Sequence, residues 1–104
     1  MKPTIEQIQE AVCAVYGVTI NDIKSKKQSR TITDARITSM ALCREYKLGA
    51  TTQVGAAHVR RHGSVINAVR RCGELKETDR AFRAKVEAVI IALMANVIVS
   101  GGVK

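Results

Sequence analysis

Residues 51–72 have the sequence TTQVGAAHVRRHGSVINAVRRC, which follows the order of a short helix, a tight turn and a second helix. Thr51 or Thr52 is expected to cap the short helix over residues 53–58, since a threonine hydroxyl accepts a hydrogen bond from a free N–H group. A serine cap and a glycine stop bound the second helix at residues 64–73. This stretch therefore predicts a helix-turn-helix.

The second helix has one apolar face and one polar face. Its apolar residues recur at spacings i, i+3, i+4 and i+7, which predicts a face packed on the core: Val65, Ala68, Val69 and Cys72. The opposite face carries small and polar residues, namely Gly63, Ser64, Asn67, Arg70 and Arg71. Asparagine pairs with adenine and arginine with guanine in the major groove, and a helix N-terminus favours a phosphate. We therefore expect this face to bind double-stranded DNA.

Positive charge gathers around the same stretch. Residues 24–71 hold eleven Lys and Arg against two acids, a net charge of +9, whereas residues 1–23 sum to −2 and residues 72–104 to +1. Such a concentration is typical of a surface that meets a polyanion. The side chains predicted to lie beside the DNA backbone belong to the turn before the second helix: Arg60, Arg61 and His62.

The remaining pattern predicts one all-α domain, residues 1–104, with five to six helices and an aliphatic core. Thr4 and Gln7 have capping-box spacing at the start of the first helix. The expected elements are a helix over 4–16 stopped by Gly17, a short turn of helix over 19–23, a basic loop over 24–30, a helix from Thr33 or Asp34 to Gly49, and a long final helix within 78–98 capped by Thr78.

Several functional classes are disfavoured. Three aromatic residues are too few for the stacking platforms of single-stranded nucleic acid binding, which weakens an RNA-binding role. The widely spaced Cys13, Cys43 and Cys72 form no metal motif and predict buried free thiols in a reducing cytosol. His58 is expected to pack inside or end a helix, and a Ser64–His62 hydrolase pair lacks the Gly-x-Ser-x-Gly elbow. We expect a cytoplasmic, nucleoid-associated protein without membrane segment, enzymatic activity, metal, cofactor or small-molecule substrate.

Three segments resemble the C-terminal DNA-binding domain of the bacterial replication initiator DnaA. They are residues 34–45 (DARITSMALCRE), residues 54–55 (VG) and residues 60–71 (RRHGSVINAVRR). That family has a basic loop, a helix with an arginine near its start, an Ile-Gly pair and a signature close to Arg-Asp-His-Thr-Thr-Val-x-His-Ala. The resemblance covers about residues 5–95. It implies a Trp-repressor-like helical bundle whose basic loop reaches a minor groove while the signature helix reads the major groove.

The resemblance also implies roles for particular residues. Arg36 matches the family's DNA-contacting arginine after the loop, and residues 62–64 fall on the His-Thr-Thr positions. The basic loop contributes Lys26, Lys27 and Arg30.

The chain departs from the family pattern at several positions. These departures are Arg61 for Asp, Gly63 for Thr, Asn67 for His, Gln28 or Lys27 in the region of the minor-groove arginine, and a turn before Arg60 that is one residue shorter. The chain has no GxxxxGK[ST] nucleotide-binding loop, so we expect a solitary domain; a phage or mobile element is one hypothesis for its origin.

The final helix is apolar on two sides. One stripe is expected to cover the core: Phe82, Val86, Val89, Ile90, Leu93 and Val97. A second stripe carries Ile91, Met94 and Ile98 with Ala88, Ala92 and Ala95. A helix that is apolar all round must be buried on both sides, which leaves two alternatives. Either the helix forms a homodimer, or it sits centrally among the other helices.

Two functions from different classes remain. The first is sequence-specific binding of double-stranded DNA in replication control or transcriptional regulation. The second is a protein-interaction module whose apolar last helix binds a replication initiator or another partner. Variants of the polar face distinguish them, because only the first function needs that face.

Overall fold

The structure is a computed structural model that describes residues 2–102, with side chains through residue 95. Its elements in chain order are α1 (Ile5–Tyr16), α2 (Ile20–Lys24), α3 (Arg30–Glu45), α4 (Thr51–Ala57), α5 (His62–Thr78) and α6 (Arg80–Gly102). Helices and their connections account for all of the described backbone. The predicted all-α class and helix number are therefore confirmed.

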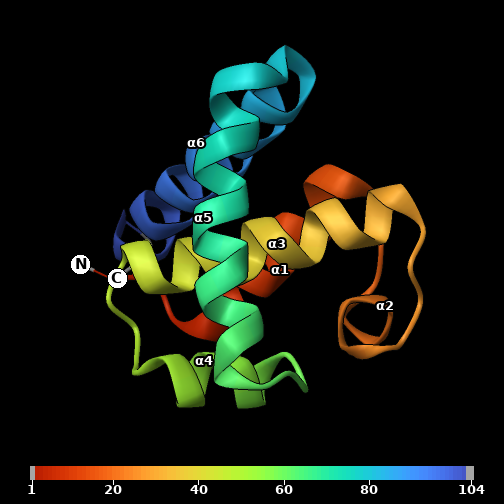
Figure 1. The fold of residues 1–104 in the computed structure, drawn as a ribbon. Helices are drawn as coiled ribbons and strands as arrows, with labels where there is room; N and C mark the ends of the chain where they lie inside the picture. The colour runs from red at the N-terminus through yellow and green to blue at the C-terminus, as the bar shows by residue number, and fades with distance from the viewer. Residues whose placement is uncertain (1, 103–104) are drawn as a thin grey trace.

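The helices pack around α3, which contacts α1 on one side and α5 on another. In Figure 1, α5 crosses over α3, α6 returns alongside α5, and α2 lies apart at the end of α3. The core is aliphatic, as predicted, and its fully buried members include Ile8, Val12, Ile23, Leu42, Val54, Val65 and Val89. Each such side chain contributes about 1.5–3 kcal/mol when it leaves water. This packing supports α4 and α5 from behind.

The first two helices begin and end where the sequence predicts. The hydroxyl of Thr4 accepts from the backbone N–H of Gln7 at 3.1 Å, and the Gln7 side chain accepts from the N–H of Thr4 at 2.8 Å. Gly17 ends α1 in the left-handed conformation at φ 70°, which costs glycine little. Thr19 caps α2 in the same reciprocal way. Local side-chain chemistry therefore determines this region.

The bounds predicted for α3 are wrong at both ends. Ser29 caps the helix, because its hydroxyl accepts from the N–H of Ile32 at 3.3 Å, so the helix begins before Thr33 and Asp34. The helix ends well before Gly49, because Lys47 adopts the left-handed conformation at φ 58°. An unbranched lysine tolerates this conformation when the surrounding hydrogen bonds fix it.

The junction between α5 and α6 also differs from the prediction. Helix α5 continues through Gly73 to Thr78, because buried residues beyond the glycine, such as Leu75, extend its core-facing side. Thr78 does not cap α6, since its hydroxyl donates back to the carbonyl of Glu74 at 2.9 Å. Asp79 provides the cap instead, and its Oδ1 accepts from the N–H of Phe82 at 3.1 Å.

Over the residues whose side chains the structure describes, 80–95, helix α6 is buried on one side only. Its core-facing residues are Phe82, Val86, Val89 and Leu93, with Ile90 half-buried. Ile91 and Met94 are 65% and 58% exposed, so the prediction that this helix could sit centrally is wrong. Val97 and Ile98 lie outside the side chains that the structure describes. Among the described residues, no helix has the length and hydropathy needed to cross a membrane.

Candidate nucleic-acid interface

A tight turn joins α4 to α5. Helix α4 begins at Thr51, and the residue before it, Ala50, donates its N–H to Oε1 of Gln53 at 2.8 Å, so neither Thr51 nor Thr52 is its cap. The N–H of Arg60 donates to the carbonyl of Gly55 at 2.7 Å. A Cβ atom at Gly55 would lie 2.6 Å from the carbonyl oxygen of Arg60. The turn therefore requires glycine at this position.

His58 ends α4 from inside the core, which confirms its predicted role in packing and as a helix end. Its side chain is fully buried; Nδ1 lies 2.8 Å from the carbonyl of Val54 and Nε2 lies 2.6 Å from Oγ of Ser39. Because a carbonyl only accepts, Nδ1 carries the proton and Nε2 accepts from the serine hydroxyl. Burial lowers the pKa of His58, and the charges of nearby Lys and Arg side chains lower it further. His58 is therefore neutral, and it fixes α4 to α3.

Helix α5 turns one side to the core and the other to solvent. The buried side consists of Val65, Ala68, Cys72 and Leu75. Val69, which was predicted to be buried, is 45% exposed, because the buried residues recur at i, i+3, i+7 and i+10 and leave it at the edge. Asn67, Arg70 and Arg71 are exposed. The polar side of the helix is therefore free to meet another molecule.

The exposed polar groups of α5 make only weak contacts with one another. Nη2 of Arg70 lies 3.4 Å from Oδ1 of Asn67, and Nη1 of Arg71 lies 3.8 Å from Oε1 of Glu74. Exposed pairs of this kind contribute little to stability. These side chains can therefore exchange their present partners for others at small cost.

The start of α5 lies two residues earlier than predicted, at His62 instead of Ser64. Arg61 occupies the N-cap position, and its side chain has no hydrogen-bond acceptor. Arg61 and His62 are exposed, whereas Gly63 and Ser64 are half-buried in the first turn. Since an arginine cannot cap a helix, the N-terminus of α5 retains its attraction for an anion.

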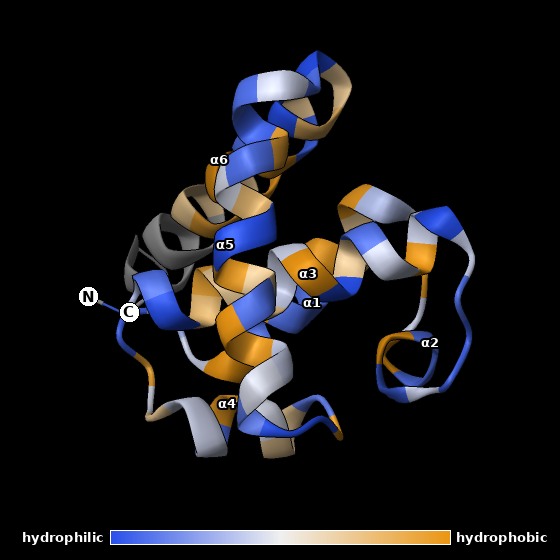
Figure 2. Cartoon of the chain, viewed as in Figure 1, coloured by the Kyte–Doolittle hydropathy of each residue, from blue (hydrophilic) through white to orange (hydrophobic). Residues whose placement is uncertain are grey.

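The loop between α2 and α3 is hydrophilic, as Figure 2 shows. Lys26, Lys27 and Arg30 are all exposed. Nζ of Lys27 lies 3.1 Å from Oδ1 of Asp22, and Nη2 of Arg30 lies 3.0 Å from Oδ2 of Asp79. Arg30 therefore ties the start of α3 to the junction between α5 and α6.

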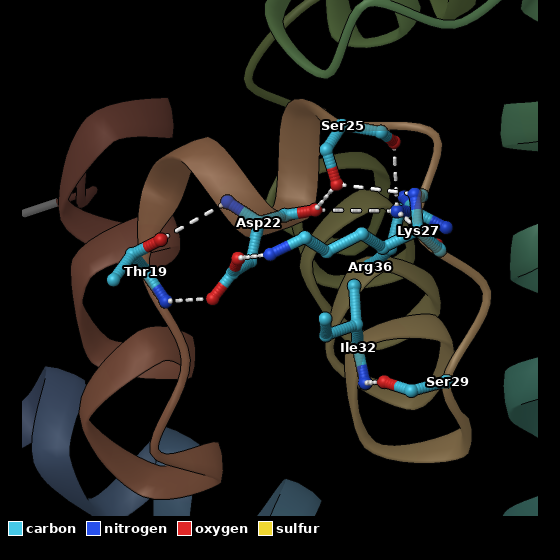
Figure 3. A network of polar contacts seen from close by, with 7 residues as sticks. All are labelled: Thr19, Asp22, Ser25, Lys27, Ser29, Ile32 and Arg36. Carbon is cyan, nitrogen blue, oxygen red and sulfur yellow. Dashed lines mark hydrogen bonds and ion pairs between the residues drawn. The ribbon is translucent and has the colours of Figure 1, made fainter.

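Arg36 lies beneath this loop, with 5% of its surface exposed. Its Nε donates to the carbonyl of Ile23 at 2.7 Å, and its Nη2 donates to the carbonyls of Ser25 and Lys27, both at 3.0 Å. Figure 3 shows the arginine side chain reaching into the turn of the loop. Burial lowers the pKa of Arg36. The resemblance implies a DNA contact for Arg36, but here its guanidinium holds the loop backbone, a role that no local sequence signal indicates.

Arg60 reaches the same loop from the other side. Its Nη1 donates to the carbonyl of Val59 at 2.9 Å, and its Nη2 donates to the carbonyl of Ser25. The basic loop and the turn before α5 are therefore joined by one side chain. Residues distant in sequence are thereby brought to one part of the surface.

The cysteines and histidines form no metal site. Within the described residues, no three His, Cys, Asp or Glu side chains are placed to hold a metal ion. Cys43 and Cys72 are buried, as predicted, and Cys13 is half-buried. Burial raises the pKa of Cys43 to about 12. A buried thiol with such a pKa is unreactive, so Cys43 serves packing.

Comparison with known proteins is consistent with this geometry. The family model described as the bacterial dnaA protein helix-turn-helix matches residues 5–72. The chromosomal replication initiator protein DnaA of Thermodesulfovibrio yellowstonii is 34% identical over 88 residues, which are 84% of this chain and 20% of that protein. The chain thus spans about a fifth of the length of the curated relative it matches.

Proposed function

The chain belongs to the family of bacterial DnaA helix-turn-helix domains, and from this we propose that it binds double-stranded DNA with sequence specificity. A helix-turn-helix of this family is a DNA-binding domain. Sequence is read where side chains reach base edges, whereas contacts with phosphates set position and orientation. The polar face of α5 would therefore read the bases, and the basic residues around it would contact the phosphates.

The observation that carries the proposal is the orientation of α5. Val65, Ala68, Cys72 and Leu75 are buried, while Asn67 and Arg71 are exposed on the side that faces away from the core, as are Ile66 and Val69. Asparagine and arginine are the side chains best suited to bidentate bonds with adenine and guanine in the major groove. We assign base contacts to this face of α5.

The surrounding cations supply affinity without sequence preference. Arg61 and His62 lie at the N-terminus of α5, and Lys26 and Lys27 lie in the loop that Arg36 and Arg60 hold in place. Contacts between such side chains and phosphates release counterions, which makes affinity depend strongly on salt. We assign Arg36 and Arg60 a positioning role toward this loop.

The biological setting that fits these assignments is control of replication or transcription. A DNA-bound domain of this kind can occupy a site and exclude or recruit other proteins there. We propose a phage or mobile element as the source of the protein and the nucleoid as the place where it acts. No enzymatic activity, cofactor or small-molecule substrate forms part of the proposal.

Selection from a random duplex library at near-physiological salt tests the proposal. An enriched motif is expected, and a palindromic motif would indicate binding as a dimer. Recovery of sequences without a common motif would contradict sequence-specific binding.

Variants then test the assigned face. Changing both Asn67 and Arg71 to Ala is expected to lower affinity for the selected motif by about 10- to 1,000-fold. Arg83→Ala is the matched control, because it also removes one exposed cation but lies on α6. Circular dichroism should show unchanged helicity in all variants. Equal binding by the double variant and the parent would refute the assignment of the α5 face.

A second candidate function uses α6. Exposure of Ile91 and Met94 on one helix favours a protein-interaction surface, either for a homodimer or for a replication initiator. Light scattering at micromolar concentration separates the homodimer from a monomer of 11.3 kDa. Changing Ile91 and Met94 to Lys should convert a dimer to monomer, whereas a parent that is already monomeric would exclude the homodimer.

A further inference from the structure

Helix α4 ends with an unusual residue in a common motif. The N–H of Val59 donates to the carbonyl of Ala56 at 3.0 Å, and the N–H of Arg60 donates to the carbonyl of Gly55 at 2.7 Å. These are the two hydrogen bonds of a Schellman motif, whose left-handed position is usually glycine. Here that position holds Val59 at φ 55°. A β-branched residue in this conformation is strained.

Neither packing nor backbone preference explains the valine. The residue is 62% exposed, so it adds little to the core. Lys47 occupies the same left-handed position after α3, at φ 58°, but lysine is unbranched at Cβ and experiences less strain. Strained residues of this kind cluster at functional sites. An exposed valine in a cationic surface offers an apolar contact to an external molecule.

The position of Val59 is set by Arg60. One guanidinium donates to the carbonyl of Val59 and to that of Ser25, so Val59 lies where the basic loop meets the turn before α5. The exposed residues Arg61 and His62 follow immediately. Val59 therefore lies between the two parts of the surface assigned to DNA, the basic loop and the start of α5.

Building on the proposed DNA binding, we propose that Val59 is a specificity-determining residue that contacts the 5-methyl group of a thymine at the edge of the major groove. The thymine methyl is the apolar group that base edges present in that groove, and apolar side chains recognise it. A valine cannot bond to a phosphate, so it adds sequence preference to a surface whose cations have none. The same contact accounts for the valine in a position that suits glycine.

Replacement of thymine by uracil in the selected duplex, one position at a time, provides the test. For the parent protein, loss of the contacted methyl should weaken binding about fourfold at one position, the effect of one buried methyl group. Val59→Gly should bind the thymine duplex as weakly as the parent binds the uracil duplex, and should show no further loss on uracil. Val59→Ile keeps an apolar branched side chain and should retain the thymine preference.

Stability separates this effect from misfolding. Glycine suits the left-handed position, so Val59→Gly should unfold at or above the temperature of the parent while it binds more weakly. Equal affinity of parent and Val59→Gly, or an equal loss of affinity on thymine and uracil duplexes, would overturn the inference. If the parent selects no motif at all, the proposed function fails first, and the inference fails with it.

Discussion

Arg36 and Arg60 come from different elements, yet both donate to the carbonyl oxygen of Ser25. Arg36 approaches from α3 and Arg60 from the turn before α5. The two side chains thereby fix the basic loop next to the helix-turn-helix before any ligand is present. Because ordering a loop on binding costs affinity, this arrangement favours recognition of a ligand that spans both parts.

The role of Arg36 can be tested by Arg36→Lys. Lysine keeps the charge, but a single ammonium cannot reproduce the planar set of bonds to the loop carbonyls. We expect a loss of about 2–3 kcal/mol in the free energy of unfolding, with faster amide hydrogen exchange in residues 25–28. Arg30→Lys is the control, since Arg30 is 75% exposed and its replacement should cost less than about 1 kcal/mol. Equal stability of the two variants would show that Arg36 does not hold the loop.

Salt dependence should distinguish phosphate contacts from base contacts. Arg61 is exposed at the N-terminus of α5, and Arg61→Ala should weaken binding to specific and nonspecific duplexes alike. The slope of log affinity against log salt should fall by about one. Asn67→Ala, in contrast, should leave the slope unchanged while it relaxes specificity. Titrations from 50 to 200 mM salt, over which such affinities fall by orders of magnitude, measure both. An unchanged slope in Arg61→Ala would remove Arg61 from the phosphate-binding set.

Two glycines should respond in opposite directions to alanine. Gly55→Ala places a Cβ atom 2.6 Å from the carbonyl oxygen of Arg60, so the turn must shift, at a cost of about 1–3 kcal/mol. Gly73 lies inside α5 with open space around its Cβ position. Gly73→Ala should therefore stabilise the protein by about 0.5–1 kcal/mol. Urea unfolding of both variants tests the pair, and a stable Gly55→Ala would contradict the close approach at the turn.

His58 should make stability depend on pH. Its pKa is lower in the folded protein than the ordinary value of 6.5, so unfolding takes up a proton when the pH is below that value. The free energy of unfolding is retained above pH 6.5. As the pH decreases below 6.5, the free energy of unfolding falls by up to about 1.4 kcal/mol per pH unit until the pH reaches the folded-state pKa. His58→Gln should flatten the profile measured by denaturant unfolding, whereas His62→Gln, an exposed control, should not. A parent profile that is flat below pH 6.5 would contradict the burial of a neutral His58.

The helix-turn-helix and the first two helices were predictable from short-range signals. The capping boxes that begin with Thr4 and Thr19 involve residues three apart, and Gly17 stops α1 for a local reason. The predicted helix ends at Gly49 and Gly73 are wrong. Helix α3 ends before Gly49, whereas α5 continues through Gly73. At Gly73 the burial of Leu75 outweighs the modest helix-breaking tendency of glycine.

The sequence alone determined the all-α class, the concentration of positive charge and the polar side of α5, because these depend on composition and helical spacing. Only the tertiary structure decided that Arg36 is buried and that Arg60 reaches Ser25, residues 35 apart in the chain. It also decided that Val59 takes a left-handed conformation at the junction of loop and turn. Such relations arise when distant backbone groups need hydrogen-bond donors, and no periodic pattern in the sequence encodes that need.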